Sequence, residues 1–182
     1  WADCYQLMDY LPLFHNLKGR RIVVVGGGEI ALRKVRLVQE ASALITIIAK
    51  DFCPDLLEMA AKDKASGCNG LELITAGYEH QHLLQYPDTV MVIAATNDRD
   101  LNRLVSEHAQ AANMLSNVVD DPGFSTVIFP SIVDRSPIQV AISSGGDAPV
   151  LVRLLRTRFE SLLPAGMAKL GSLAGSFRER VK

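Results

Sequence analysis

The stretch RIVVVGGGEIA, residues 21–31, runs from a short apolar segment through three glycines into helix-forming sequence. As strand, tight turn and helix, it matches a dinucleotide-binding fingerprint in which Gly26, Gly28 and Ala31 take the three small positions. Gly26 permits the sharp turn, Gly28 lets the backbone approach a pyrophosphate, and Ala31 lets the helix pack closely on the sheet. The phosphates would lie at the helix N-terminus, where free N–H groups favour negative charge.

The sequence around this fingerprint predicts an α/β domain with a Rossmann-type parallel sheet. Residues 22–25 form the continuous β-branched run of a strand that is buried on both faces. Residues 44–48 read as a second buried strand that completes a βαβ unit. A glycine-rich turn without a ligand is the alternative for residues 26–28. Further strands are expected at 71–75, 90–95 and 115–119, with helices at 54–65 and 98–112.

The chain after residue 122 departs from this alternation. Residues 126–129 and 138–142 are expected to form two strands that pair antiparallel, joined through 133–137. Residues 148–182 are expected to be helical, with a break near Pro164 and Gly166.

Composition is that of a folded soluble protein, with 182 residues of which 48% are apolar and 21% charged. A net charge of −1 gives no support for binding to nucleic acid or to an anionic membrane, and no apolar run reaches the ~18 residues that span a bilayer. Cys4, Cys53 and Cys68 stand at irregular spacing, so we expect reduced thiols in a cytoplasmic protein. The first seven residues are expected to be an extension outside the fold.

The tips of two predicted strands supply candidate cofactor contacts. Many NAD-binding domains carry Asp or Glu at the tip of the second strand, where this chain has Lys50 and Asp51. Both are candidates to contact the adenosine ribose, and a solvated loop is the other interpretation. Lys50 tolerates a 2′-phosphate, so NADP remains an alternative to NAD. Thr96, after the fourth strand, either contacts the cofactor or caps the next helix, as Asn97 or Asp98 could also do.

Through a succession of six motifs, the chain resembles one protein family. Their order and combination are specific, and they cover residues 8–182, which resemble the N-terminal half of bacterial siroheme synthase and the stand-alone precorrin-2 dehydrogenases and sirohydrochlorin ferrochelatases. The motifs are MDYLPLF, VVGGGEIALRKVRLV, VIAATNDRDLN, SNVVDDP, FPSIVDRSPIQVAISSGGDAPVLVRLLR and ESLLP.

The resemblance implies a homodimer with an NAD-binding domain at 1–113, a dimerisation region with a catalytic aspartate at 114–147 and a helical region at 148–182. It implies NAD-dependent oxidation of precorrin-2 to sirohydrochlorin, then insertion of ferrous iron, a substrate, to give siroheme. A uroporphyrinogen methyltransferase, fused or separate, is a further implied partner. By motif, Asp120 is the acid/base candidate, Ser144 matches a serine that can be phosphorylated, and the NAD-contacting positions are Glu29, Ile30, Lys50 and Asp51.

The position of Asp120 supports its implied role. It follows the fifth predicted strand, and parallel sheets bind ligands at the carboxyl ends of their strands. A carboxylate there can accept the proton released when the macrocycle is oxidised and those released when iron enters. Asp121 is easily confused with it, and a turn before Pro122 is the alternative role for Asp120.

A tetrapyrrole that carries many carboxylates needs cations and backbone donors around it. The turn at 143–146 precedes a helix and offers free N–H groups, and arginines are suited to bidentate carboxylate binding. A solvated surface charge is the alternative for each arginine. The candidate substrate contacts are Ser144, Gly145, Gly146, Arg135, Arg153 and Arg156.

The histidines are not expected to bind metal. His80 and His82 are expected in a solvated loop, and His15 and His108 stand alone, so metal ligands stay unassigned. No Gly-Lys-Ser/Thr follows the glycine turn, which argues against a P-loop hydrolase. Two alternatives of other classes remain: a regulatory module that senses NAD without chemistry, and an inactive paralogue retained as a dimeric scaffold.

Overall fold

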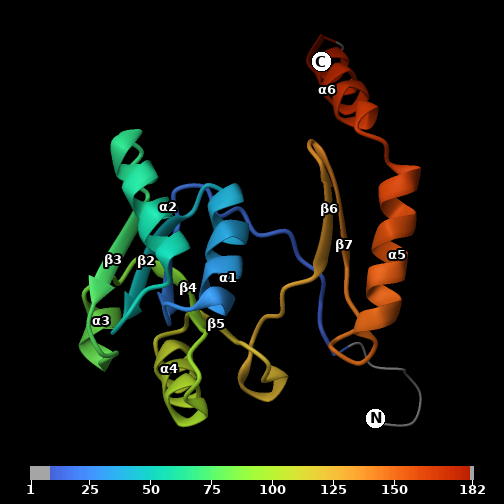
Figure 1. Ribbon diagram of the computed structural model, residues 1–182. Helices are drawn as coiled ribbons and strands as arrows, with labels where there is room; N and C mark the ends of the chain where they lie inside the picture. The colour runs from blue at the N-terminus through green and yellow to red at the C-terminus, as the bar shows by residue number, and fades with distance from the viewer. Residues whose placement is uncertain (1–8, 181–182) are drawn as a thin grey trace. The chain divides into compact units, whose positions relative to one another are not determined.

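The structure, a computed structural model, describes residues 9–180 and the side chains up to residue 177 (Figure 1). Residues 1–8, which include Cys4 and the predicted N-terminal extension, lie outside the described residues, as do residues 181–182. The chain forms two compact units, one of Leu11–Val127 and one that contains the chain from Ile128 onward.

The first unit is a five-stranded parallel sheet with strand order β3-β2-β1-β4-β5. With the small strand pair and the helices that follow it, this arrangement confirms the predicted Rossmann-type fold class. The strands are β1 (Arg21–Val25), β2 (Leu44–Ala49), β3 (Leu71–Thr75), β4 (Thr89–Ala94) and β5 (Leu115–Val118). The helices are α1 (Glu29–Glu40), α2 (Pro54–Ala65), α3 (His80–Leu84) and α4 (Arg99–Ala111), followed by the 3-10 turn η1 (Pro122–Phe124).

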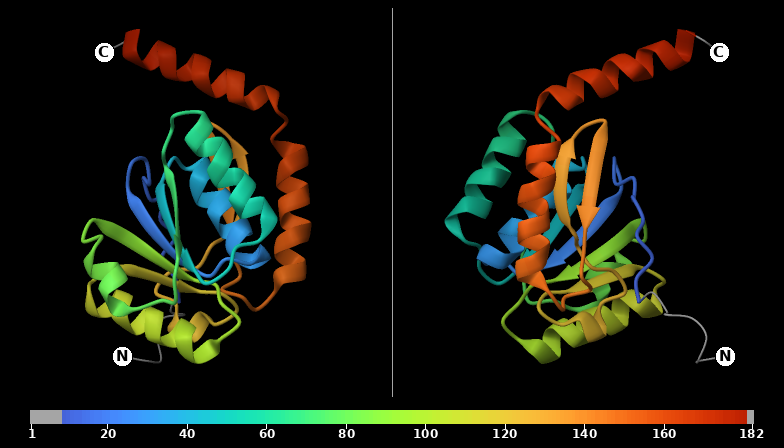
Figure 2. Two further views of the ribbon diagram at one scale, coloured as in Figure 1. Left: turned by 60° about the vertical axis from the view of Figure 1, so that its left-hand side comes forward. Right: turned by 90° about the vertical axis from the view of Figure 1, so that its right-hand side faces the viewer.

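The sheet is buried on both faces. Val23 and Ile48 belong to a core cluster with Val105 of α4. Ile22 and Val24 lie on the opposite face and are also fully buried, because α1 and α2 cover that face (Figure 2). The continuous β-branched run of β1 therefore matches its position in the middle of a covered sheet.

The second unit consists of an antiparallel hairpin and two helices. Strand β6 (Ser131–Arg135) pairs with β7 (Ile138–Ile142), and Ser136 and Pro137 form the turn between them. Helices α5 (Pro149–Leu162) and α6 (Gly166–Arg180) follow. The interruption between them includes Pro164, so the predicted helix break is confirmed.

The first strand of the hairpin was predicted wrongly at 126–129. The backbone N–H groups of Thr126 and Val127 both donate to the backbone oxygen of Ser116, at 2.8 and 3.1 Å, so this segment lies against β5. Pro130 then has no N–H group to offer to a strand ladder. The partner of β7 therefore begins only at Ser131.

Two other features of the first unit differ from the sequence-based expectation. The unit extends to Val127, past the boundary expected after residue 113, because β5 is hydrogen-bonded to β4. Helix α3 replaces the expected solvated loop around His80 and His82. The backbone N–H of Glu79 donates to Nδ1 of His82 at 2.9 Å, which completes a capping box that stabilises this short helix.

Candidate active site

The first two glycines of the turn after β1 are required by the protein itself. Gly26 has φ 124°, and a Cβ atom there would overlap the backbone oxygen of Ala95. A Cβ atom on Gly27 would overlap the backbone oxygen of Asp51. The fingerprint did not single out Gly27, because the motif leaves this position unspecified and only the packing of the loop after β2 shows the need.

Gly28 differs from the other two because an added Cβ atom would meet nothing within 4 Å. It is the N-cap of α1, and Gly28, Glu29 and Ile30 are all exposed. The helix therefore begins with free backbone N–H groups at an open surface, as an anion such as a pyrophosphate requires. Ala31 is fully buried, in agreement with its predicted role in packing the helix against the sheet.

The loop after β2 lies beside this turn. The backbone N–H of Cys53 donates to the Gly27 oxygen at 2.7 Å. Lys50 and Asp51 precede it at the end of β2, and the side chains of both are exposed. The structure thus brings these two candidate ribose contacts next to the glycine turn.

Thr96, the candidate at the tip of β4, uses its hydroxyl within the protein. This oxygen lies 2.7 Å from Oδ1 of Asn102 and 3.1 Å from the backbone oxygen of Asp98, and both are acceptors. The cap of α4 is Asp98, whose Oδ1 accepts from the Leu101 N–H at 3.0 Å. Asn102 was missed by sequence reasoning, because a polar residue in the first turns of a helix gives no signal of burial.

The two adjacent aspartates after β5 have different surroundings. Asp121 is partly buried and forms an ion pair with Arg99, N to O distance 3.0 Å. Asp120 is exposed and has φ 59°, in the left-handed region that Asp tolerates better than most residues. Asp121 is therefore occupied by a structural contact, whereas Asp120 faces solvent.

A lysine of α1 lies within electrostatic reach of Asp120. Burial lowers the pKa of Lys34 below its ordinary value, and the negative charge of Asp120 acts in the opposite direction and raises it. Sequence reasoning did not select Lys34, because it stands among other basic residues of an amphipathic helix. Asp120, the candidate base, therefore has the positive charge of Lys34 in its surroundings.

In the second unit, the turn before α5 is built around Ser144. Its hydroxyl oxygen accepts from the Ala148 N–H at 3.0 Å, and Gly145 and Gly146 have φ values of 69° and 111°. Both glycines therefore adopt backbone conformations that other residues rarely take. Arg153 lies one turn into α5 and is exposed.

Arg135 does not join the turn that contains Ser144. Its Nε donates to the backbone oxygen of Leu163 at 2.8 Å, just past the C-terminus of α5, whereas Ser144 lies before the N-terminus of this 14-residue helix. These two ends are about 20 Å apart at 1.5 Å per residue. Arg156 pairs with Glu160 at 3.0 Å. Of the three candidate arginines, Arg153 is the one in the first turns of α5 that is exposed and forms no ion pair with the described residues, whereas Arg156 is exposed but pairs with Glu160.

Two known protein families match parts of the chain. The family described as "Putative NAD(P)-binding" matches residues 13–131, more than half of the chain. The chain belongs to this family. A second family, "Sirohaem biosynthesis protein central", matches residues 135–162.

Curated relatives and one solved structure are consistent with this assignment. Over 175 residues, 96% of the chain, it is 50% identical to the siroheme synthases of Stutzerimonas stutzeri (strain A1501) and Pseudomonas entomophila (strain L48). The chain spans 36% of the length of each relative. The fold is similar to that of SirC, a precorrin-2 dehydrogenase, with TM-score 0.70 at 23% identity over 90% of this chain and 76% of that chain.

The NAD(P)-binding family match contains every candidate cofactor residue and also Asp120. The second match contains the candidate substrate contacts Arg135, Ser144 and Arg153. Within residues 9–180, no helix is long and apolar enough to cross a membrane.

Three histidines of this NAD(P)-binding unit, His80, His82 and His108, form a cluster with Tyr78 at α3 and α4. His108 therefore does not stand alone, contrary to the sequence-based expectation. Its ring stacks on that of His80, centroids 4.1 Å apart, and Nδ1 of His108 lies 3.1 Å from the Tyr78 hydroxyl. Burial, followed by the neighbouring His80, lowers the pKa of His108, and burial raises the pKa of Tyr78 to about 12. His82 is buried. Among the described residues no three His, Cys, Asp or Glu side chains could together hold a metal ion.

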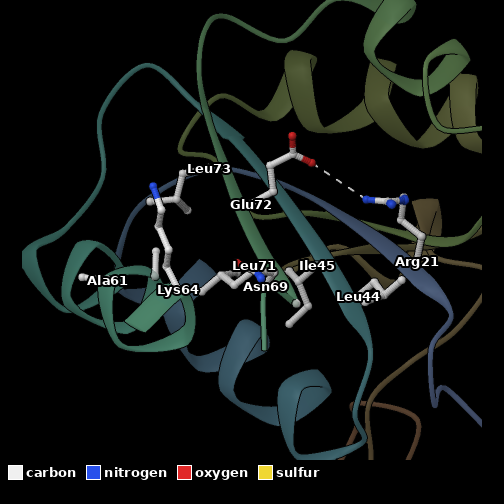
Figure 3. A pocket seen from close by; sticks show the side chains of 11 residues that line it. Arg21, Leu44, Ile45, Ala61, Lys64, Asn69, Leu71, Glu72 and Leu73 are labelled. Carbon is white, nitrogen blue, oxygen red and sulfur yellow. Dashed lines mark ion pairs between the residues drawn. The ribbon is translucent and has the colours of Figure 1, made fainter. Parts of the chain in front are cut away.

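A cavity of about 570 Å³ lies away from the glycine turn (Figure 3). Its lining includes Arg21 and Leu71, the first residues of β1 and β3, and an ion pair of 3.9 Å joins Arg21 to Glu72. The cavity therefore lies at the amino ends of the strands, opposite to the edge where the turn and Asp120 emerge. It has no part in the candidate active site.

Proposed function

We propose that this chain binds NAD at the glycine turn and oxidises precorrin-2 to sirohydrochlorin, with Asp120 as the group that accepts the substrate proton. The observation that carries the proposal is the register of the sheet: Val25 pairs with Ala94, and Ala94 pairs with Val118. The glycine turn and Asp120 therefore leave the same edge, from strands that are about 10 Å apart at ~4.8 Å per strand spacing. That distance leaves room for the nicotinamide and the tetrapyrrole between the glycine turn and Asp120.

The residues of the turn fit the proposed cofactor. The open space at Gly28 and the exposed start of α1 suit a pyrophosphate. Lys50 and Asp51 would hold the ribose, and the backbone at Thr96 would border the nicotinamide. NAD would supply the hydride acceptor when bound.

Asp120 would take the proton. An exposed carboxylate at the sheet edge can reach a bound macrocycle, and Lys34 supplies a compensating positive charge nearby. General base catalysis of this kind contributes about 10²- to 10⁴-fold to a rate.

The proposal extends to insertion of ferrous iron into sirohydrochlorin, for which Asp120 would accept the pyrrole protons. Iron enters as a substrate, and the macrocycle provides the nitrogen ligands. Because the described residues contain no cluster that could hold a metal, we assign no resident metal site.

The second unit would bind substrate carboxylates and join two copies of the chain. The turn at Ser144 and the exposed Arg153 are the proposed carboxylate contacts, and Ser144 is the proposed phosphorylation site.

The proposed homodimer rests on helix α5. Its side chains Val150, Leu151 and Leu154 are 59%, 54% and 65% exposed and form an apolar stripe that a second copy would cover. Sedimentation at low micromolar concentration tests the homodimer, and a stable monomer would contradict it.

Two further parts of the proposal concern the cellular setting. The curated relatives are longer than this chain, which agrees with a methyltransferase as a fused or separate partner. The irregularly spaced cysteines agree with a cytoplasmic location.

The test is NADH production from precorrin-2 by the wild type, Asp120→Asn and the matched control Asp121→Asn. We expect a loss of about 10²- to 10⁴-fold in Asp120→Asn with NAD binding retained, because the amide keeps the size of the side chain but removes the base. Wild-type turnover in this variant would overturn the mechanism. Iron insertion is measured separately, and if it alone survives, the two reactions use different groups.

The same assay separates the alternatives. Wild-type protein that binds NAD but does not oxidise precorrin-2 would fit an NAD-sensing module. Wild-type protein that binds neither molecule yet forms a dimer would fit an inactive scaffold.

A further inference from the structure

Asn102 is a buried polar residue to which the proposed reaction gives no role. It lies in α4, and only 4% of it is exposed. Its side-chain oxygen accepts from the Thr96 N–H at 3.1 Å, and its side-chain nitrogen donates to the Thr96 backbone oxygen at 2.9 Å. One primary amide therefore satisfies both backbone groups of the residue that follows the tip of β4. These two backbone partners also fix which end of the amide carries the oxygen.

The backbone that Asn102 holds lies between the two halves of the candidate active site. On one side, Ala95 donates its N–H to the Val25 oxygen at 2.8 Å, and its own oxygen fills the place of a Cβ on Gly26. On the other side, the Val119 N–H donates to the Ala94 oxygen at 3.0 Å, one residue before Asp120. A displacement of residues 94–96 would therefore move the glycine turn and the base relative to each other.

The hydroxyl of Thr96 is not available as a donor to a cofactor. It has one proton and two acceptors inside the protein, Oδ1 of Asn102 and the backbone oxygen of Asp98. The same oxygen accepts from the Asp98 N–H at 3.2 Å. The side chain of Thr96 thus contributes to the conformation of its own loop.

We propose that Asn102 is a positioning residue for the cofactor: its amide fixes the tip of β4 against the glycine turn, and Thr96 acts through its backbone. The inference rests on the proposed binding of NAD at that turn. An amide is needed because it must accept one hydrogen bond and donate another. Aspartate could only accept, and leucine, of similar size, could do neither.

The test compares Asn102→Leu and Asn102→Asp with Asn97→Ala, a control at an exposed position of the same loop. NAD dissociation constants are measured directly, well below the unfolding temperature of each variant. We expect an increase of about tenfold or more in Asn102→Leu, because a buried N–H and C=O lose their partners. We also expect an increase in Asn102→Asp, because its carboxylate can accept from the Thr96 N–H but cannot donate to the Thr96 oxygen. Asn97→Ala should keep an NAD dissociation constant close to that of the wild type.

A second measurement uses the protein without NAD. Amide hydrogen exchange at Thr96 should be faster in Asn102→Leu, because its N–H has lost its acceptor. A role in stability alone would lower the unfolding temperature and leave the dissociation constant of the folded protein unchanged. If Asn102→Leu does not fold, Asn102→Asp carries the test.

Each outcome supports or overturns the inference. Wild-type NAD affinity in a folded Asn102 variant would overturn the inference and leave the proposed function intact. If the wild type itself does not bind NAD, the proposed function fails, and the positioning role fails with it.

Discussion

The guanidinium of Arg99 lies 3.0 Å from the carboxylate of Asp121 and joins the first turn of α4 to the loop after β5. Because Arg99 is largely exposed, the pair should contribute about 1 kcal/mol or less. We expect Asp121→Asn to unfold at a slightly lower temperature and to oxidise precorrin-2 at close to the wild-type rate. Thermal unfolding and NADH production check this. A loss as large as that of Asp120→Asn would reverse the roles of the two aspartates.

Gly27→Ala should destabilise the first unit, because the new methyl group overlaps the Asp51 backbone oxygen. Overpacking of this kind typically costs about 1–3 kcal/mol. The matched control is Gly175→Ala in α6, where the methyl group meets no atom within 4 Å and should stabilise the helix by about 0.5–1 kcal/mol. Urea unfolding measures both, and an unchanged midpoint in Gly27→Ala would contradict the packing described for this turn.

Gly28→Asp should keep the fold and lose NAD binding. The side chain has open space, but it places a negative charge where the pyrophosphate would approach the helix N-terminus. Gly28→Ala separates size from charge and should retain more affinity. The difference in NAD affinity between Gly28→Asp and Gly28→Ala should become smaller in high salt, because salt screens exposed charges. Retained micromolar affinity in Gly28→Asp would show that the phosphates bind elsewhere.

Acid should destabilise the first unit through His108. Burial and the neighbouring His80 lower its pKa in the folded state below the ordinary 6.5, so below that pH the unfolded chain binds the proton more readily. The free energy of unfolding should therefore be retained above the unfolded-state pKa and fall as pH drops through it, from about pH 7 towards pH 5. His108→Gln should reduce this dependence, whereas the exposed His15→Gln should not. If the free energy of unfolding depends on pH equally in the two variants, His108 is not the source of the acid sensitivity.

Ser144→Asp should weaken tetrapyrrole binding without disturbing the turn. A carboxylate can still accept from the Ala148 N–H, as the serine oxygen does, but it repels a polycarboxylate ligand. Ser144→Asn is the neutral control of equal size, and NAD affinity should be the same in both. Spectroscopic titration with sirohydrochlorin measures the effect. Equal affinity in the two variants would remove Ser144 from the proposed site.

The parallel sheet could be predicted because its signals are local. The β-branched run before Gly26 marks a buried strand, and Pro54 at the first position of α2 marks a helix start. The second strand of the hairpin, 138–142, was predicted correctly, but the first strand could not be placed. Residues 126–129 have the composition of a strand, while the backbone N–H groups of Thr126 and Val127 donate to Ser116 of β5. That choice depends on a contact between segments, which residue composition does not report.

In the candidate site, too, some residues could be predicted from the sequence and others could not. Gly26, Gly28, Lys50 and Asp51 were predicted from a motif, and the structure gathers them at one edge. The capture of Arg135 by the Leu163 oxygen and the burial of Asn102 depend on partners elsewhere in the chain. Glu79 and His82 stabilise a helix too short for periodicity to reveal.

The packing of Gly26 on Ala95 and of Gly27 on Asp51 limits how the cofactor preference of this chain can be engineered. A library that varies Gly26 and Gly27 would mostly yield misfolded protein, because a side chain added at either position displaces a neighbouring loop. Lys50 and Asp51 project from the same edge with exposed side chains, so their substitution leaves the backbone intact. Selection for NADP over NAD should therefore recover changes at these two positions, with Gly26 and Gly27 unaltered.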